Sequence, residues 1–516
     1  MSTSHSENVA PTTASQGATP TGKRVAQSLG AGIVCVGLLM ILQRGIGLGR
    51  SLIICDWLPD GALGEWELSF SFLMAVGPLM VLGIPGAFGR FAEGYRQRKQ
   101  IGRFIAVTSV ACGTVYAISM LGLFLGRDIA TTVFFGAGRD NGWLWAILPA
   151  LASVVVFNYT TSMLSALRLH TEFARCQATQ GVGFAVLCLL CVPASDYTAG
   201  GVIVAYALAS LITSSLAALY LWQCTREETA PRLDGPGLSF VAELVQVMRA
   251  ILPMAVAVWL ATFIANTFLV TDRALIMNLA EGEEIALFFV AQYHVAGILA
   301  RLMEQFAMTL AAVITPHLAE DWDRGEKELA SQRLSSLLKL ISLLFCTASI
   351  PVVIIAPWLL DWIGDRFELA VKLLPWTLAT SITLGLAYVF QNAFWCTKRT
   401  WWTSVAFLVG LGLNVALGIA LFPILNVYGV VISTYLSMAA TFVVMLSAAR
   451  GLGFRFPFST YLLLALPGAL TLGYLGCCVV LILLVHLALV PSMYAIQRER
   501  DYLRELVRRR FGRLTS

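Results

Sequence analysis

The sequence predicts an all-α integral membrane protein with 12 to 14 transmembrane helices. Hydrophobic residues make up 58% of the 516 residues and charged residues only 13%, whereas soluble domains carry about 25% charged residues. Apolar runs of 18 to 25 residues recur along the chain, and a helix of that length crosses the hydrocarbon core of a bilayer. Basic residues alternate from one connecting loop to the next, which indicates a chain that crosses the membrane repeatedly.

Twelve apolar runs predict the core helices, in chain order 29–55, 66–88, 104–126, 142–165, 174–194, 200–222, 250–271, 285–315, 336–362, 369–395, 401–424 and 427–448. The last apolar stretch, 458–495, is long for one helix and short for two. We expect a tight helical hairpin that turns near Gly473–Gly476, which brings the count to 14.

The basic residues predict the orientation of the chain. Of 35 Lys and Arg residues, 27 lie in the terminal tails or in loops that lead from an even to an odd helix, and five lie in the opposite loops. Cytoplasmic loops are enriched in Lys and Arg. The N-terminus is therefore predicted to be cytoplasmic, as is the C-terminus with its seven arginines after Gln497.

Short repeated fragments predict two related lobes of six helices. Arg50-Ser-Leu-Ile recurs as Arg273-Ala-Leu-Ile, and Gly200 precedes Tyr206 as Gly429 precedes Tyr435. An even number of helices in each repeat gives both copies the same orientation, with the pseudo-twofold axis along the membrane normal. The predicted parts are a disordered tail (1–25), an N-terminal lobe (26–223), a cytoplasmic linker (224–248), a C-terminal lobe (249–449), extra membrane segments (450–495) and a basic amphipathic tail (496–516).

The C-terminal tail places Tyr502, Leu503, Leu506 and Val507 on one stripe among arginines. This pattern is typical of a helix that lies on an anionic membrane surface. The alternative is that the tail docks a polysaccharide polymerase or a glycosyltransferase.

Three arginines, Arg44, Arg50 and Arg301, remain inside predicted spans. An arginine at membrane depth costs at least about 2.5 kcal/mol, so it normally faces a wet or paired interior. Arg44 is predicted in mid-span, whereas Arg50 is close enough to the outer end to reach the interface instead. We therefore take these arginines as candidate substrate-binding residues.

Helix 285–315 carries two further candidates beside Arg301. Glu304 lies three residues on, so the two either form a buried ion pair or Arg301 binds an anionic substrate group while Glu304 exchanges a proton. His294 lies two turns earlier on the same face. It is either a hydrogen-bonded packing residue or, because histidine titrates near neutral pH, a coupling residue.

The sequence contains no motif for binding a metal, ATP or a nucleic acid. Cys188 and Cys191 form a C-x-x-C without a nearby His or second pair, so no metal is expected. The chain has no phosphate-binding G-x-x-x-x-G-K-[ST] loop, so ATP is not expected, nor is any cofactor. No basic patch is interleaved with aromatic residues, which argues against a nucleic acid partner.

Four stretches together resemble the polysaccharide flippases of the multidrug/oligosaccharidyl-lipid/polysaccharide exporter superfamily. They are LQRGIGLGRSLIICDWLPDGALGEW, GPLMVLGIPGAFGRFAEGY, NTFLVTDRALIMNLAEGEEIALFFVAQYHVAG and LGLNVALGIALFPILNVYGVVISTYLS, and the likeness covers about residues 25–450. The resemblance implies two six-helix lobes around a V-shaped central cavity. It also implies alternating access in the bacterial cytoplasmic membrane, with a polyprenyl-pyrophosphate-linked oligosaccharide as substrate. Two arginines six apart in the first helix are similar to the lipid II flippase branch, although Ser51 stands where that branch has an acidic residue.

The leading hypothesis is thus a flippase in which Arg44, Arg50 and Arg301 neutralise a pyrophosphate, with His294 or Glu304 coupling transport to an ion gradient. Arginine stays charged and binds phosphate oxygens in a bidentate manner. A multidrug or organic-cation antiporter is the second hypothesis, and it predicts carboxylates deep in the first lobe, where the sequence suggests none. A membrane-embedded glycosyltransferase or polymerase is the third. It would need a large loop, and the predicted outer loops are all under about 20 residues.

Overall fold

The protein was analysed as a computed structural model, which describes residues 29–489 apart from 99, 137–141, 168 and 229–239. Within these residues every regular element is a helix. The predicted disordered tail (1–25) and the predicted amphipathic tail (496–516) lie outside the described residues.

The first lobe consists of α1 to α8. Their bounds are α1 Leu29–Trp57, α2 Asp60–Leu79, α3 Ile84–Gln97, α4 Ile101–Leu125, α5 Arg127–Phe135, α6 Gly142–Ala166, α7 His170–Ala194 and α8 Ala199–Glu228.

The second lobe consists of α9 to α15, followed by three shorter helices. The bounds are α9 Phe240–Leu279, α10 Glu283–Asp323, α11 Lys327–Ile363, the 3₁₀ turn η1 Asp365–Phe367, α12 Glu368–Phe390, α13 Asn392–Cys396, α14 Trp401–Leu425, α15 Val427–Gly451, α16 Phe458–Leu464, α17 Leu466–Leu470 and α18 Tyr474–Leu489.

The predicted membrane fold is confirmed. Nine helices in the described part of the chain are long and apolar enough to cross a membrane. The three remaining predicted core spans fall on α1, on the α2–α3 pair and on α9. The last apolar stretch forms the predicted hairpin, with α16 and α17 in one arm and α18 in the other. Its turn contains Gly473 at φ +62°, a conformation that favours glycine.

Two helix boundaries differ from the prediction in a way that matters for the site. The α2 helix begins at Asp60, six residues before the predicted span, because the apolar run underestimates where a membrane helix starts. The α9 helix continues to Leu279, eight residues past the predicted end. Arg273, which the sequence placed in an outer loop, is therefore inside a helix.

The second predicted span is broken into α2 and α3 at Gly83 and Pro85. Leu82 and Gly83 have φ values of +46° and +64°, and Pro85 occupies the first turn of α3, where its missing N–H costs nothing. A side chain at Gly83 would begin 2.7 Å from the Ala255 carbonyl oxygen of α9. The break therefore lets the chain pass very close to the first helix of the second lobe.

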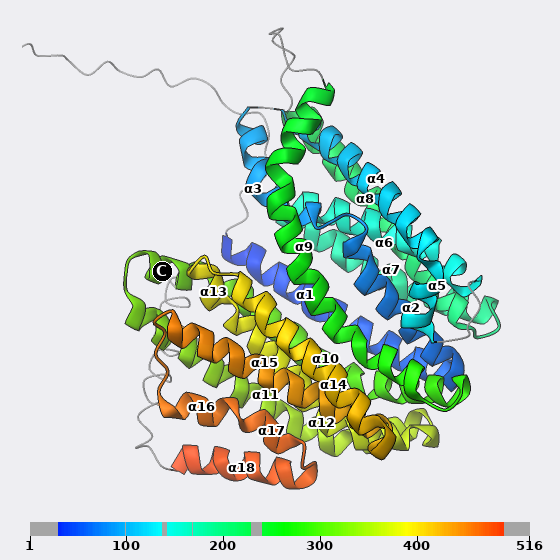
Figure 1. Ribbon diagram of the computed structural model, residues 1–516, viewed down its shortest axis with the longest axis vertical. Coiled ribbons are helices and arrows are strands. Elements are labelled where there is room, and N and C mark those ends of the chain that lie inside the picture. The colour runs from blue at the N-terminus through cyan, green and yellow to red at the C-terminus, as the bar shows by residue number, and fades with distance from the viewer. Residues whose placement is uncertain (1–28, 99, 137–141, 168, 229–239, 490–516) are drawn as a thin grey trace, which may run out of the picture.

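The two lobes form a V (Figure 1). Their ribbons diverge toward the ends marked by α3 and α13, and they come together where α2 meets α9 and α10. We call the joined side the predicted outer end, because the loop between α1 and α2 is predicted to be extracytoplasmic. The first-lobe core continues into the second lobe along α9 and, at the predicted outer end, through Leu287, Phe367, Phe422 and Val427.

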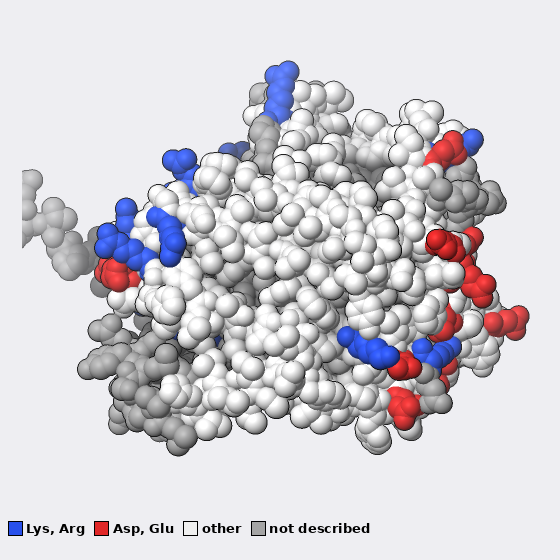
Figure 2. Space-filling model, turned by 60° about the horizontal axis from the view of Figure 1, so that its bottom comes forward, with Lys and Arg blue, Asp and Glu red and all other residues white. Residues whose placement is uncertain are grey.

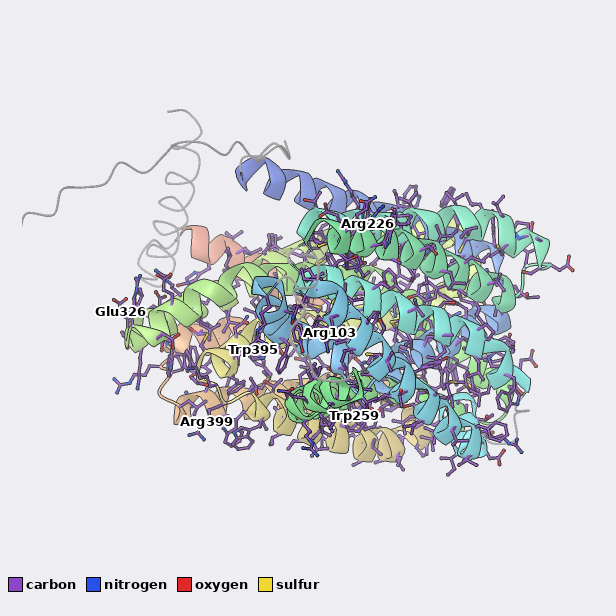
Figure 3. All side chains as sticks on the ribbon, turned by 90° about the horizontal axis from the view of Figure 1, so that it is seen from above. Arg103, Arg226, Trp259, Glu326, Trp395 and Arg399 are labelled. Carbon is purple, nitrogen blue, oxygen red and sulfur yellow. The ribbon has the colours of Figure 1, made fainter. Side chains whose placement is uncertain are left out.

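The charge distribution fits a membrane protein. Figure 2 shows a broad belt without charged side chains, with mostly basic groups at its left end and mostly acidic groups at its right end. In Figure 3, Arg103 and Arg226 of the first lobe lie near the middle of the view, while Glu326 and Arg399 of the second lobe lie toward its left edge. These residues stand at helix ends predicted to be cytoplasmic.

Candidate functional site

The centre of the site is Glu67, which the sequence analysis did not single out. It lies seven residues, or two helical turns, after the first residue of α2. It is only 1% exposed. The expectation that the first lobe has no deep carboxylate is therefore wrong. Since Glu67 stands at the edge of the apolar run, only the earlier start of α2 reveals that it is inside the protein.

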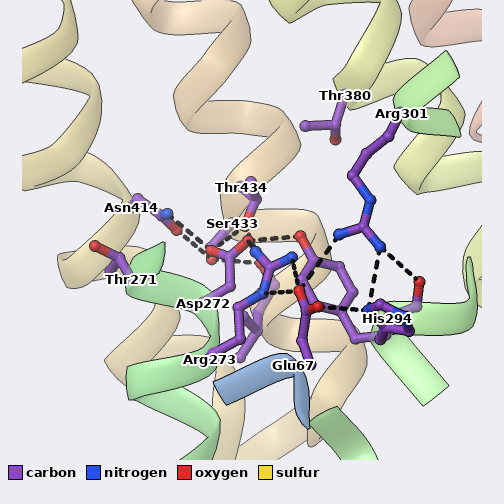
Figure 4. A network of polar contacts seen from close by, with 12 residues as sticks. Glu67, Thr271, Asp272, Arg273, His294, Arg301, Thr380, Asn414, Ser433 and Thr434 are labelled. Carbon is purple, nitrogen blue, oxygen red and sulfur yellow. Dashed lines mark hydrogen bonds and ion pairs between the residues drawn. The ribbon is translucent and has the colours of Figure 1, made fainter. Parts of the chain in front are cut away.

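Three cationic or titratable side chains of the second lobe converge on Glu67 (Figure 4). Arg273 donates to Glu67 Oε1 from Nη2 at 2.9 Å and from Nε at 3.2 Å. Arg301 donates to the same oxygen from Nη1 at 3.3 Å. His294 Nδ1 lies 2.5 Å from Oε2. Because Glu67 comes from α2 and its partners come from α9 and α10, the cluster ties the two lobes together.

The His294 ring nitrogen links the cluster internally. A contact of 2.5 Å between Nδ1 and a carboxylate oxygen requires a proton between the two atoms. Arg301 Nη2 also lies 3.2 Å from the same nitrogen, and 3.3 Å from the His294 carbonyl oxygen. The single lone pair of Nδ1 cannot serve both contacts, so Arg301 is held by the Glu67 carboxylate and the His294 carbonyl oxygen.

Side chains of the second lobe donate the hydrogen bonds that the Asp272 carboxylate accepts. This carboxylate accepts hydrogen bonds from Tyr293 at 2.5 Å, Thr434 at 2.7 Å and Asn414 at 3.0 Å. Arg273 Nη1 is 3.9 Å away, so these two adjacent residues form only a long ion pair. The shorter contacts of Arg273 are with Glu67 in the other lobe.

Arg44 also reaches across the junction between the lobes. Its Nη2 donates to Gln305 Oε1 of α10 at 2.7 Å. Gln305 is four residues, about one turn, beyond Arg301. Arg44 and Arg301, both predicted as substrate-binding residues, are therefore brought to neighbouring positions along α10.

Glu304 does not pair with Arg301. In the described part of the chain Arg301 forms its ion pair with Glu67 instead. The alternative of a buried Arg301–Glu304 pair is therefore wrong. Glu304 lies on the side of α10 that approaches α12. Its Cα is 3.7 Å from the position that a Cβ atom would take at Gly385 of α12.

Arg50 lies apart from the other predicted site residues. Its guanidinium stands 4.0 Å from the centre of the Phe184 ring, and its nearest polar partner, the Ser51 hydroxyl, is 3.5 Å away. Phe184 in turn packs against Trp66 and Tyr206. Arg50 thus lies over one ring of an aromatic cluster inside the first lobe, and its predicted role in substrate binding stays a prediction.

A second set of contacts joins the lobes nearer the predicted outer end. Arg366 of η1 donates to the Cys55 carbonyl oxygen of α1 at 2.5 Å and lies 3.6 Å from the Asp60 carboxylate. Nearby, a side chain added at Gly64 of α2 would begin 2.4 Å from the Leu287 carbonyl oxygen of α10. Helices this close require glycine at the crossing point.

No group of three or more His, Cys, Asp or Glu side chains in the described residues could hold a metal ion. The site is instead an assembly of arginines and carboxylates at a junction between two lobes. Such an arrangement can bind an anion, exchange a proton and change partners when the lobes move.

No protein-family model matches the chain, and no curated protein matches it. Solved structures do. A lipid II flippase, MurJ, in an inward closed conformation superposes with a TM-score of 0.60 at 12% identity, over 93% of this chain and 100% of that one. An inward-facing multidrug resistance MATE transporter of the MOP superfamily gives 0.58 at 13%, over 82% and 98%. A MOP superfamily transporter from Pyrococcus furiosus gives 0.55 at 14%, over 82% and 96%. At such low identity the comparisons show a shared fold, and the proteins that share it are transporters.

Proposed function

We propose that this protein moves a polyprenyl-pyrophosphate-linked oligosaccharide from the cytoplasmic to the outer leaflet of the bacterial cytoplasmic membrane. The glycan would serve cell-surface polysaccharide synthesis, such as lipopolysaccharide or exopolysaccharide. The observation that supports this proposal best is the row of arginines at the junction of two lobes. Arg44, Arg301 and Arg273 meet there along α10, in a protein whose surface is otherwise broadly apolar.

Arginine suits the proposed substrate. Its guanidinium remains charged at any physiological pH and matches two phosphate oxygens at once. In apolar surroundings such charge-assisted hydrogen bonds are stronger than in water. The polyprenyl chain needs no polar path, because it can stay in the bilayer while only the pyrophosphate and sugars pass between the lobes.

The arrangement of the lobes supports alternating access. The polar contacts of Glu67 and Arg366 join the lobes at the predicted outer end, while the ribbons diverge toward the predicted cytoplasmic side (Figure 1). In the proposed cycle the substrate headgroup enters from the cytoplasm and meets Arg44 and Arg301. The outer contacts then break so that it can leave.

His294 is the stronger of the two proposed coupling residues. Its ring contacts the Glu67 carboxylate, one of the contacts that must break, so a change in its protonation would act on the junction between the lobes. Glu304 remains the other proposed coupling residue. It is partly buried in α10, and none of the other described side chains donates a hydrogen bond to it.

A cation-coupled multidrug antiporter of the same fold is the second proposal. Glu67 favours it, because that proposal needs a carboxylate deep in the first lobe. The arginines oppose it, since Arg273 and Arg301 already neutralise Glu67 and would repel a cation. We therefore place the flippase first.

The proposal is tested by complementation in a strain that lacks this gene, with surface glycan as the readout and membrane protein levels checked by immunoblot. Arg44→Ala and Arg301→Ala should insert normally and lose most glycan export, and Arg301→Lys should restore part of it. Export at wild-type level in both Ala variants would overturn the proposal. Lost resistance to cationic drugs in the deletion strain, with glycan unchanged, would favour the antiporter.

A further inference from the structure

We infer that Arg273, His294 and Arg301 form a second anion site on the second lobe, which Glu67 occupies as an internal ligand while the lobes are joined. When the lobes separate, the pyrophosphate of the substrate takes the place of the Glu67 carboxylate. This inference rests on the proposed function and adds to it a defined exit position and a named competitor.

The donors and the acceptor come from different lobes. Three nitrogen atoms, Arg273 Nε, Arg273 Nη2 and Arg301 Nη1, lie between 2.9 and 3.3 Å from a single oxygen of Glu67. All three belong to α9 or α10, whereas Glu67 belongs to α2. A phosphate oxygen accepts the same hydrogen bonds as a carboxylate oxygen. The second lobe therefore presents a formed cradle to whichever anion lies opposite.

The second lobe holds these donors in place without help from Glu67. The Arg273 guanidinium lies 4.8 Å from the centre of the Tyr293 ring, and Tyr293 is itself tied to Asp272 at 2.5 Å. Arg301 donates to the carbonyl oxygen of His294 at 3.3 Å. Because these contacts lie within one lobe, they persist when α2 moves away. A site held in this way loses little order when it exchanges one anion for another.

The charges also require a replacement for Glu67. With His294 neutral, the three charged side chains nearest Glu67, which are Asp272, Arg273 and Arg301, carry one positive charge in excess. Glu67 supplies the matching negative charge, and its side chain is 2% exposed. Separating one partner from a buried ion pair is strongly unfavourable. An anion that binds as Glu67 leaves removes this penalty, so substrate binding favours opening.

Differences in exposure give the order of events. The side chain of Arg301 is 36% exposed, against 12% for Arg273. Its 3.3 Å bond is also the longest of the bonds to Glu67. Arg44, through Gln305, stands one turn away on the cytoplasmic side of Arg301. A headgroup that arrives at Arg44 therefore competes first for Arg301 and only then for Arg273.

The test is the binding of inorganic pyrophosphate to the purified full-length protein in a lipid-free detergent solution, measured by calorimetry. Glu67→Gln should bind pyrophosphate at least about fivefold more tightly than the wild type, because the internal competitor is removed. Glu368→Gln is the matched control, since it removes one exposed carboxylate from the predicted outer end. It should bind as the wild type does. Adding Arg273→Gln to Glu67→Gln should reverse the gain, because it removes two of the three donors to the anion.

Equal or weaker binding by Glu67→Gln would overturn the inference. The proposed function would survive that result if Arg44→Ala and Arg301→Ala, each made in a protein that keeps Glu67, still weaken pyrophosphate binding. If no arginine variant weakens binding, the pyrophosphate part of the proposed function fails as well.

A second measurement serves if Glu67→Gln does not fold. Spin labels carried by non-natural amino acids at Thr198 and Ile424 would report the distance between the predicted outer ends of the two lobes. Both side chains are exposed. In the wild type, pyrophosphate should lengthen this distance. An unchanged distance at saturating pyrophosphate would contradict displacement of Glu67.

Discussion

Arg50 and Arg273 begin the two copies of a repeated fragment, yet their surroundings have little in common. Arg50 faces the Phe184 ring at 4.0 Å, inside the first lobe. Arg273 binds the Glu67 carboxylate at 2.9 Å, across the junction between the lobes. Among the described residues no carboxylate forms an ion pair with Arg50, whereas Arg273 lies between two of them.

The difference shows that the two copies of a repeated sequence fragment can place an arginine in different environments. The Phe184 ring stabilises Arg50 through the ring quadrupole, and both residues belong to the first lobe and move with it. A carboxylate from the opposite lobe makes the arginine sensitive to lobe movement. Arg50 is therefore suited to holding α1 against α7, and Arg273 to sensing whether the lobes are joined.

The largest expected effect is that of Arg273→Ala. Removing one partner of a buried ion pair leaves the other charge uncompensated and costs about 3 to 5 kcal/mol. We expect a clearly lower thermal unfolding temperature in detergent, together with loss of glycan export. A variant as stable and as active as the wild type would remove the contrast with Arg50.

Gly64→Val should come next, because it separates the lobes without touching a charge. Its side chain would begin 2.4 Å from the Leu287 carbonyl oxygen, and overpacking of this kind costs about 1 to 3 kcal/mol. We expect reduced export and a longer distance between labels at Thr198 and Ile424. Gly61→Val is the matched control, since nothing lies within 4 Å of a side chain added there. The same loss in both variants would point to helix α2 itself.

Arg50→Leu tests the other arginine of the comparison, which contacts an aromatic ring and no carboxylate among the described residues. It removes the cation but leaves an apolar side chain against the Phe184 ring, and a desolvated cation–π contact is worth about 2 kcal/mol. We expect a modest fall in unfolding temperature with most of the glycan export retained. Complete loss of export from a correctly inserted protein would indicate that Arg50 binds substrate, as the sequence predicts.

The smallest effect should be that of Arg366→Gln. This change weakens hydrogen bonds to the end of α1 and a 3.6 Å ion pair with Asp60 that is partly exposed. A partly exposed pair contributes about 1 kcal/mol or less. Export should stay near the wild-type level, with a small increase in the distance between the predicted outer ends. A loss as large as that of Arg273→Ala would show that Arg366, and not Glu67, is the main contact between the lobes.

The prediction from sequence was most successful where the chain meets lipid. The apolar runs located the core helices and the terminal hairpin, because backbone groups in hydrocarbon must bond within a helix. The arginines at 44 and 301 stood out for the same reason. Glu67 did not, because it is the second residue of the predicted span 66–88, where a carboxylate is expected to reach the membrane surface. Arg273 was likewise assigned to a loop because α9 continues eight residues past the apolar run.

Local sequence was thus sufficient for the helical membrane fold, since the cost of exposing polar groups to lipid acts on each segment separately. Only three-dimensional packing added Glu67 and Arg273 to the site and brought them to Arg301 and His294. Glu67 is separated from Arg273 by 206 residues and from Arg301 by 234. No short-range pattern links charges so far apart in the chain. They are neighbours because α2 and α10 pack so closely that only glycine fits at position 64. A buried charge is costly unless it is paired, so these charges lie beside opposite ones.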